Sequence, residues 1–184
     1  MSKVVKNNFF ILTGSPGSGK TSILRELQSL GYLVVPEYAR EIIREQRIID
    51  GEGVYDRDPR LFKELMLSRA IHDYEQHSIH LCPVIFDRGI PDILVYADCF
   101  GLERGSESNA ASNFQYNNTV FFSPSWREIY ANDEDRKISY EEAQQFGNNL
   151  EATYLECGYQ VVRLPLVSPL ERATFIIDKL GTTL

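Results

Sequence analysis

The sequence is short of cysteine, of long hydrophobic runs and of basic residues. Its three cysteines are widely spaced and form no C-x-x-C pair, so we expect reduced, partly buried thiols at Cys82, Cys99 and Cys157. No stretch approaches the roughly 18 apolar residues of a membrane span. The N-terminal Met1-Ser2-Lys3 leads directly towards the first predicted strand. We therefore expect no membrane segment and no signal peptide, and a cytoplasmic location.

Charge and histidine content argue against two further kinds of site. The formal net charge is −7 and the pI is about 5.0, whereas a nucleic-acid or anionic-membrane surface needs a basic face. No cysteine or carboxylate completes a metal site with the three histidines. We expect a solvated helix face for His72, His77 and His80. The length is that of one domain over residues 1–184.

The most informative motif is a glycine-rich segment near the N-terminus. Residues 14–21 read Gly-Ser-Pro-Gly-Ser-Gly-Lys-Thr, which matches the phosphate-loop (P-loop) pattern G-x-x-x-x-G-K-[ST] without a gap. The apolar run 9–12 precedes it as a predicted strand, and a helical pattern follows it. The backbone N–H groups of such a loop and the N-terminus of the next helix converge on phosphate oxygens. The motif therefore predicts binding of a nucleoside triphosphate.

Individual positions of this loop have expected roles. Lys20 is expected to reach the β- and γ-phosphates of ATP, and the Thr21 hydroxyl to bind Mg²⁺. The expected nucleotide contacts come from the loop and the residue after it: Gly14, Ser15, Pro16, Gly17, Ser18, Gly19, Lys20, Thr21 and Ser22. The alternative is a glycine-rich turn between strand and helix that binds no ligand.

Predicted strands and helices alternate along the rest of the chain. Strands are expected at 9–12, 32–35, 83–87, 120–122 and 161–164. Helices are expected at 37–49, from Asp58 towards His80, at 90–100 and from Ser168 onwards, and the Gly-, Ser- and Asn-rich stretch 101–118 is expected to be a surface loop. Such alternation is typical of an α/β protein whose parallel sheet is covered on both faces. Its ligand then lies at the carboxyl ends of the strands.

Charged side chains follow two of these strands and are candidates for catalysis. Asp87 ends the third strand, where it would bind Mg²⁺ or merely cap the following turn. Glu37 follows the second strand, where it would accept the proton of an attacking hydroxyl, grip a substrate hydroxyl, or simply favour the first turn of a helix. Arg88 would pair with a phosphate or an acidic neighbour. Arg40 would pair with Glu37 or face the acceptor beside it. The residues expected to contact an acceptor are Glu37, Arg40, Arg88 and Asp92.

The segment 124–140 is expected to form a lid. It is predicted to contain two short helices joined by a charged turn. Arg127, Arg136 and Lys137 would then swing onto the transferring phosphoryl group and exclude water, with Arg136 as the preferred residue. A solvated face is the alternative explanation for such a charge run.

A further arginine opens the last predicted helix. Ser168 and Glu171 have the spacing of a capping box. Arg172 lies in the first turn of this helix, where a cation is unfavourable without a partner. It would stack on the nucleotide base or pair with Glu171.

These motifs carry a resemblance that covers almost the whole chain. The chain resembles the kinase-like predicted ATPases that are grouped under the AAA label by their phosphate loop. Beyond that loop, the resemblance depends on Pro36-Glu37-Tyr38-Ala39-Arg40, on Phe86-Asp87-Arg88-Gly89-Ile90-Pro91-Asp92 and on Trp126-Arg127-Glu128-Ile129-Tyr130.

The nearest relatives of that family with a settled activity resemble the domain that phosphorylates ribosylnicotinamide and, more distantly, deoxynucleoside and nucleotide kinases. The resemblance implies a three-layer αβα sandwich of the P-loop NTPase fold, with five parallel strands in the kinase-like order 2-3-1-4-5 and a helical lid. It implies Glu37 as the base, Asp87 as the magnesium residue and Arg136 as a lid arginine.

Two functions fit these features. The first is Mg²⁺-assisted transfer of the γ-phosphoryl group of ATP to a small nucleoside-like acceptor. The second is hydrolysis of a nucleoside triphosphate with a regulatory or partner-binding role. A GTPase switch is disfavoured because no N-K-x-D is present and because Gly89 follows Asp87 after a single residue. A ring-forming motor is disfavoured because 184 residues leave no room for its C-terminal helical domain. Both absences favour the kinase, and no protein partner is indicated.

Overall fold

The computed structural model describes residues 3–130 and 138–181. Its main sheet has five parallel strands in the order β3-β4-β2-β6-β7. Their bounds are β2 Phe9–Gly14, β3 Leu33–Val35, β4 Val84–Asp87, β6 Thr119–Ser123 and β7 Gln160–Arg163. This is the order that the sequence analysis expected, and each predicted strand is present.

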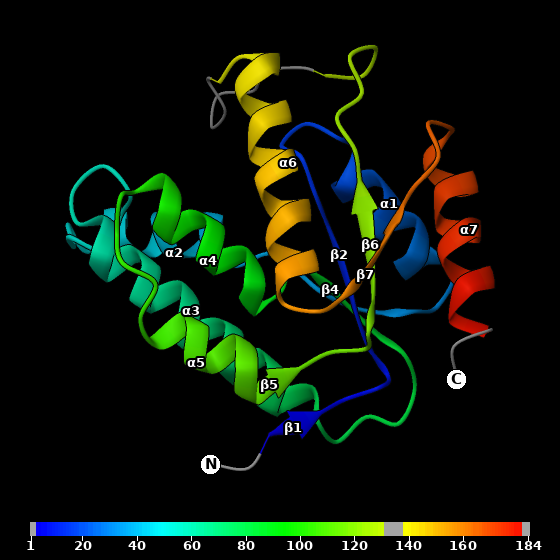
Figure 1. Cartoon of the computed structure of the whole chain (residues 1–184), viewed down its shortest axis with the longest axis horizontal. Coiled ribbons are helices and arrows are strands. Elements are labelled where there is room, and N and C mark those ends of the chain that lie inside the picture. Colours follow the sequence, from blue (N-terminus) through cyan, green and yellow to red (C-terminus); the bar gives the residue numbers. More distant parts are fainter. Residues whose placement is uncertain (1–2, 131–137, 182–184) are drawn as a thin grey trace.

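Helices cover both faces of this sheet. On one face lie α1 (Lys20–Ser29) and α7 (Pro169–Gly181), which pack on each other. The other face carries α2 Ala39–Ile48, α3 Pro59–His77, α4 Ile90–Cys99, α5 Ser106–Asn113 and α6 Tyr140–Glu156. Figure 1 shows the sheet between these two groups. The expected three-layer α/β/α sandwich is therefore confirmed.

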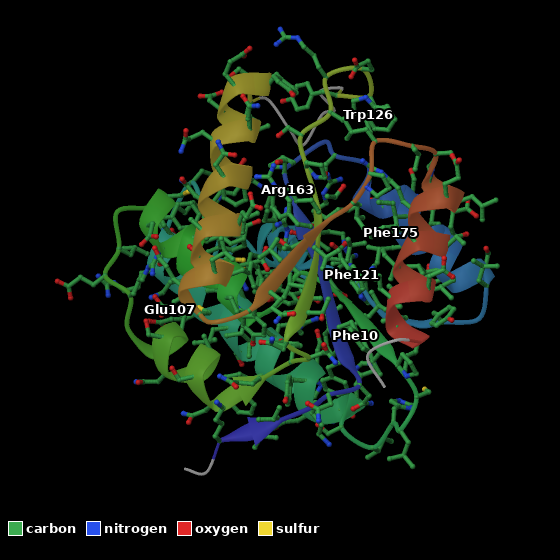
Figure 2. All side chains as sticks on the ribbon, turned by 45° about the vertical axis from the view of Figure 1, so that its right-hand side comes forward. Phe10, Glu107, Phe121, Trp126, Arg163 and Phe175 are labelled. Carbon is green, nitrogen blue, oxygen red and sulfur yellow. The ribbon has the colours of Figure 1, made fainter. Side chains whose placement is uncertain are left out.

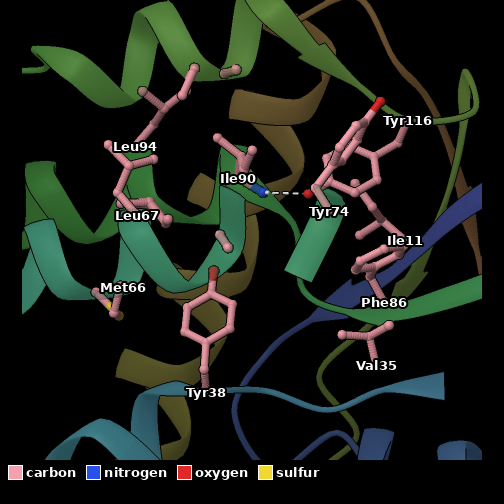
Figure 3. Close-up of a cluster of buried hydrophobic side chains, with 14 of the residues drawn as sticks. Ile11, Val35, Tyr38, Met66, Leu67, Tyr74, Phe86, Ile90, Leu94 and Tyr116 are labelled. Atoms are coloured by element: carbon pink, nitrogen blue, oxygen red, sulfur yellow. Dashed lines mark hydrogen bonds between the residues drawn. The ribbon is translucent and has the colours of Figure 1, made fainter. Parts of the chain in front are cut away.

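The strands form the centre of the core because they are apolar on both faces. All six residues of β2 are buried, as expected of a central parallel strand. Tyrosines supply much of the packing on the five-helix face, and their hydroxyls find polar partners there. Figure 3 shows one such contact, in which the backbone N–H of Ile90 donates to the Tyr116 hydroxyl over 3.4 Å.

The stretch 101–118 differs from the loop that the sequence analysis expected. It contains α5 and a two-residue strand, β5 (Phe114–Gln115), which pairs in parallel with β1 (Val4–Val5). The helix forms despite its Ser- and Asn-rich sequence because tertiary contacts outweigh weak propensity. Ala110 and Ala111 are buried, and Glu107 forms a buried ion pair with Lys63 of α3 over 2.9 Å.

Two other predictions need correction. The second helix begins at Ala39 and not at Glu37, and Ile49, the last residue of the expected range, follows its end and is 70% exposed. The predicted pair of short lid helices is wrong in the part of the segment that the structure describes. Residues 127–129 form a turn, and the Ser139 cap opens α6, which is 17 residues long. No helix of the described residues is long and apolar enough to cross a membrane.

Candidate functional site

The P-loop connects β2 to α1 at the carboxyl end of the sheet. Its backbone is fixed by a hydrogen bond from the Ser15 N–H to the Ser123 carbonyl (3.1 Å) and by another from the Ser18 N–H to the Ser15 carbonyl (3.2 Å). Gly19 precedes the helix with a φ of 84°, in the left-handed region that favours glycine. Ser22 lies in the first turn of α1. This is the local geometry of an anion site at a helix N-terminus.

Lys20 points back into this loop. Its Nζ donates to the carbonyls of Gly14 (3.2 Å) and Ser15 (3.3 Å), and the residue is 8% exposed. Burial, followed by the charge of Arg88, lowers the pKa of Lys20 to about 8, although the charge of Asp87 opposes the shift. The ammonium is thus a desolvated cation beside two loop carbonyls, and a bound phosphate would stabilise its charge.

Asp87 ends β4 with one carboxylate oxygen unused. Its Oδ1 is buried and has no hydrogen-bond partner among the described residues. Burial raises the pKa of Asp87 to about 6, although the charge of Lys20 opposes this. Asp92, not Asp87, accepts from the Gly89 N–H in the following turn. Asp87 and the exposed Thr21 line the same cavity, so an oxygen-preferring divalent cation fits this pair of side chains.

Arg88 and Glu37 meet at the next strand end. The Arg88 Nε–H donates to Glu37 Oε1 over 3.0 Å, and Nη1–H donates to Asp92 Oδ1 over 2.9 Å. Arg88 is 7% exposed. Burial opposes its charge, but Tyr96 and the nearby carboxylates raise the pKa of Arg88 well above its ordinary value. Of the partners proposed for these residues, the structure therefore pairs Glu37 with Arg88.

A cavity of about 720 Å³ joins these groups. Its polar part is lined by Lys20, Thr21, Glu37, Asp87 and Arg88, and Arg40 also borders it. Aromatic side chains form much of the remaining wall: Tyr55, Phe62, Tyr96, Phe100 and Phe146. The volume and the mixture of apolar wall and few polar groups are typical of a small-molecule site.

The aromatic wall was not predicted from the sequence. The residues of this wall come from the loop before α3, from α3 itself, from α4 and the residue that follows it, and from α6. Only one local signal was available, the spacing of four between Tyr96 and Phe100 on one helix face. Asp92, which was expected to contact an acceptor, is 1% exposed and does not line this cavity.

Arg172 lies against the P-loop from the other side. Its Nη1–H donates to the Ser18 carbonyl over 2.9 Å, and its Nε–H donates to the Pro165 carbonyl over 2.7 Å. The guanidinium carbon is 5.1 Å from the centre of the Trp126 ring. Figure 2 shows Trp126 beside the turn that precedes α7. Glu171 accepts from Ser168 as a cap, so Arg172 finds its contacts at the loop instead.

Of the two candidate lid arginines, only Arg127 lies within the described residues. Arg127 lies in the turn 127–129, and its side chain contacts the first turn of α6: Nη1 is 3.2 Å from Glu141 Oε1, and the guanidinium carbon is 4.8 Å from the centre of the Tyr140 ring. Its side chain is 71% exposed. Arg136 and Lys137 lie outside the described residues.

Comparison with known proteins gives a family and a fold. A family model described as an AAA domain matches residues 9–172. None of the curated proteins shows a significant sequence match. Among solved structures, deoxyadenosine kinase from M. mycoides with bound dATP is similar with a TM-score of 0.61 and 15% identity, over 94% of this chain and 99% of that one.

Two further structures extend this likeness. NadR protein in complex with NR has a TM-score of 0.66 and 21% identity over 98% of this chain, which spans only 52% of the NadR chain. Shikimate kinase from Acinetobacter baumannii in complex with shikimate has a TM-score of 0.51 and 15% identity, over 95% of this chain and 93% of that one. At these identities the likeness concerns the fold. The chain therefore belongs to the AAA-domain family and has the fold of the P-loop kinases, as expected of a kinase or ATPase of the P-loop class.

Proposed function

We propose that this protein is an ATP-dependent phosphotransferase that moves the γ-phosphoryl group to a hydroxyl of a small nucleoside-like metabolite. The observation that carries the proposal is the continuous cavity from Lys20 and Thr21, past Glu37 and Arg88, to the aromatic wall. A donor phosphate bound at Lys20 and Thr21 would meet, beside Glu37, the hydroxyl of an acceptor whose ring lies against the aromatic wall. Hydrolysis alone requires room for a water molecule and no apolar chamber of this size.

The aromatic wall favours an acceptor with a planar ring. Aromatic side chains bind such rings by offset stacking and edge contacts. Tyr96 and Phe146 already pair with ring centres 5.5 Å apart at the wall. Of the similar structures, deoxyadenosine kinase is named for a nucleoside and shikimate kinase for a different small acceptor. The predominance of aromatic groups supports the nucleoside-like class.

Glu37 is the proposed general base. As the acceptor hydroxyl oxygen bonds to the γ-phosphorus, its proton passes to the Glu37 carboxylate. The bond from that phosphorus to the β–γ bridging oxygen breaks, and ADP leaves. Arg88 orients Glu37 through its Nε–H, at 3.0 Å. Lys20 would turn from the loop carbonyls to the β- and γ-phosphates and balance their charge.

Thr21 and Asp87 are the proposed magnesium residues, since both border the cavity and Asp87 Oδ1 has no other described partner. When bound, the ion neutralises charge on the transferring phosphates.

Arg172 and Arg127 are proposed to contact the nucleotide. Arg172 would do so beside Trp126, and Arg127 after leaving Glu141. Arg136 stays the proposed lid arginine. Gly14 to Ser22 form the proposed phosphate site.

Mass spectrometry of reaction products tests the proposal. The protein is incubated with Mg-ATP and a defined pool of ribosylnicotinamide, deoxyadenosine, other nucleosides, nucleotides and shikimate. We expect one new species heavier by a phosphoryl group, with an equal amount of ADP. ADP formation that is equal with and without the pool would contradict phosphotransfer to these acceptors and support hydrolysis. Lys20→Ala is the control, because it removes the cation at the phosphates and should abolish both products.

A further inference from the structure

Arg88 adopts an unusual backbone conformation for an arginine. Its φ is 70°, in the left-handed region that non-glycine residues rarely adopt. Such a conformation persists only where surrounding contacts determine it. One contact is a backbone hydrogen bond from the Arg88 N–H to the Leu12 carbonyl (3.1 Å). The side-chain contacts are with Glu37 (3.0 Å), with Asp92 (2.9 Å) and with the Thr13 hydroxyl (3.5 Å).

Asp92 accepts hydrogen bonds on both of its oxygens. Oδ1 accepts from the Thr13 hydroxyl (2.6 Å) and from Arg88 Nη1–H (2.9 Å). Oδ2 accepts from the Gly89 N–H (2.9 Å) and from the Tyr154 hydroxyl. The residue is 1% exposed. Because its oxygens are used within the protein, this carboxylate orients other groups and does not contact an acceptor.

Tyr154 brings a second element into this cluster. It lies near the C-terminal end of α6, has no exposed surface, and donates its hydroxyl proton to Asp92. Burial, with the charge of Asp92, raises the pKa of Tyr154 well above its ordinary value. The hydroxyl therefore keeps its proton at neutral pH and remains a hydrogen-bond donor. The same helix supplies Phe146, whose ring centre is 5.9 Å from the guanidinium carbon of Arg88.

We propose that Asp92 and Tyr154 are positioning residues, which hold the Arg88 guanidinium and, through its Nε–H, the Glu37 carboxylate in place for phosphoryl transfer. The inference rests on the proposed function. The guanidinium is planar and its donors have a fixed geometry. Once Nη1–H is bound to Asp92 on one side, the direction of Nε–H towards Glu37 is set. Tyr154 donates a hydrogen bond to the other oxygen of Asp92 and thereby fixes the orientation of that carboxylate.

The chain offers a matched control for Tyr154. Tyr159 is also a buried tyrosine, 6% exposed, and its ring centre is 5.6 Å from that of Tyr154. Its hydroxyl accepts from the Tyr116 N–H over 3.4 Å, and no described contact joins it to Asp92 or Arg88. Tyr154→Phe and Tyr159→Phe therefore each remove one buried hydroxyl from the same region. Only the first removes a partner of Asp92.

The first test measures the Arg88 Nε–H directly. In protein labelled with ¹⁵N-arginine, this side-chain signal is assigned by its loss in Arg88→Lys, and its exchange with solvent is measured without nucleotide or acceptor. We expect Tyr154→Phe to shift the signal and accelerate its exchange roughly fivefold to tenfold, the effect of losing about one hydrogen bond. Tyr159→Phe should leave both unchanged. No change in Tyr154→Phe, or equal changes in both variants, would overturn the proposal.

The second test separates positioning from general loosening. With deoxyadenosine and ribosylnicotinamide as probes, Tyr154→Phe should lower kcat of transfer roughly tenfold or more, as expected of a misplaced base. It should leave KM for ATP and the background hydrolysis of ATP unchanged. A fall in hydrolysis equal to the fall in transfer would contradict a role through Glu37. If neither probe is phosphorylated by the unaltered protein, the proposed function with these probes fails. The exchange measurement still decides the positioning contact.

Discussion

Gly147, in the middle of α6, packs directly on Ser15 of the P-loop. A Cβ at Gly147 would collide with the Ser15 Oγ and lie 3.1 Å from the Ser15 Cβ. Ser15 is 1% exposed, and its Oγ also accepts a hydrogen bond from the Ser125 hydroxyl over 2.8 Å. The glycine is therefore explained by a close approach of α6 to the phosphate-binding backbone.

We expect Gly147→Ala to weaken binding of Mg-ATP about tenfold, because the added methyl group displaces Ser15 and with it the loop N–H groups. Isothermal titration calorimetry measures the effect. The double variant Ser15→Gly, Gly147→Ala should bind as well as Ser15→Gly alone, since the Ser15 Cα is 3.5 Å from the new Cβ. Gly181→Ala is the control in another helix, because nothing lies within 4 Å of its Cβ. Equal affinity in Gly147→Ala and the unaltered protein would refute the contact.

The P-loop and the strand-end carboxylates were predictable because their signals are local, whereas the strand order was implied by the family resemblance. Gly14 to Thr21 is contiguous, and Asp87 and Glu37 each follow an apolar run. The Gly147–Ser15 contact joins residues 132 positions apart (147 − 15), and no periodicity reports such an approach. The same reason explains why the role of Asp92 was not recognised, since Tyr154 and Thr13 reach it from distant elements.

The α5 helix was missed for a related reason. The sequence Ser-Glu-Ser-Asn-Ala-Ala-Ser-Asn of residues 106–113 has weak helix propensity. The helix is stabilised by contacts with α3 and α4, which only the assembled fold supplies.

Protonation of Lys20 should make nucleotide binding depend on pH. Burial lowers its pKa to about 8 in the free protein, whereas bound phosphates favour the charged form. At pH 9 about nine-tenths of the free protein has a neutral Lys20, so binding must take up a proton. The affinity for ATP should then be roughly tenfold lower than at pH 7. Calorimetry in two buffers of different ionisation enthalpy measures both effects. Lys20→Arg should show neither the proton uptake nor the loss of affinity at pH 9. Equal affinities of the unaltered protein at pH 7 and pH 9 would contradict the expected pKa of Lys20.

Replacement of Glu37 should separate transfer from hydrolysis. We expect Glu37→Gln to reduce transfer to the acceptor by roughly a hundredfold or more, because the amide cannot accept the hydroxyl proton. Background hydrolysis of ATP should stay, because the P-loop is unaltered. Product analysis of the pool reaction gives both rates. A variant with full transfer would show that Glu37 is not the base, and one that has lost both activities would indicate damage to the nucleotide site.

Asp87 should lower the stability of the folded protein at neutral pH but strengthen its binding of Mg-ATP. Burial raises its pKa from 3.8 to about 6, so the folded protein binds this proton more tightly than the unfolded chain does. The contribution of Asp87 to the free energy of unfolding therefore falls as pH rises from about 4 to 6. Asp87→Asn should stabilise the free protein at pH 7 by up to about 3 kcal/mol, measured by urea unfolding. The same variant should bind Mg-ATP more weakly. Lower stability at pH 7 would contradict this account.

The buried ion pair of Lys63 and Glu107 should be sensitive to the loss of one partner. Their side chains are 6% and 0% exposed and lie 2.9 Å apart, so removing one partner leaves a desolvated charge. We expect Lys63→Met to lower the free energy of unfolding by about 3–5 kcal/mol, and Lys63→Met with Glu107→Leu to recover much of it. Arg47 and Asp56 are also 2.9 Å apart but about half exposed, so Arg47→Met should lower it by less than about 1 kcal/mol. Urea unfolding of the variants decides the matter. If Lys63→Met and Arg47→Met have equal effects, the α3–α5 ion pair does not hold α5 in place, and that helix is held by its packing, which includes Ala110 and Ala111.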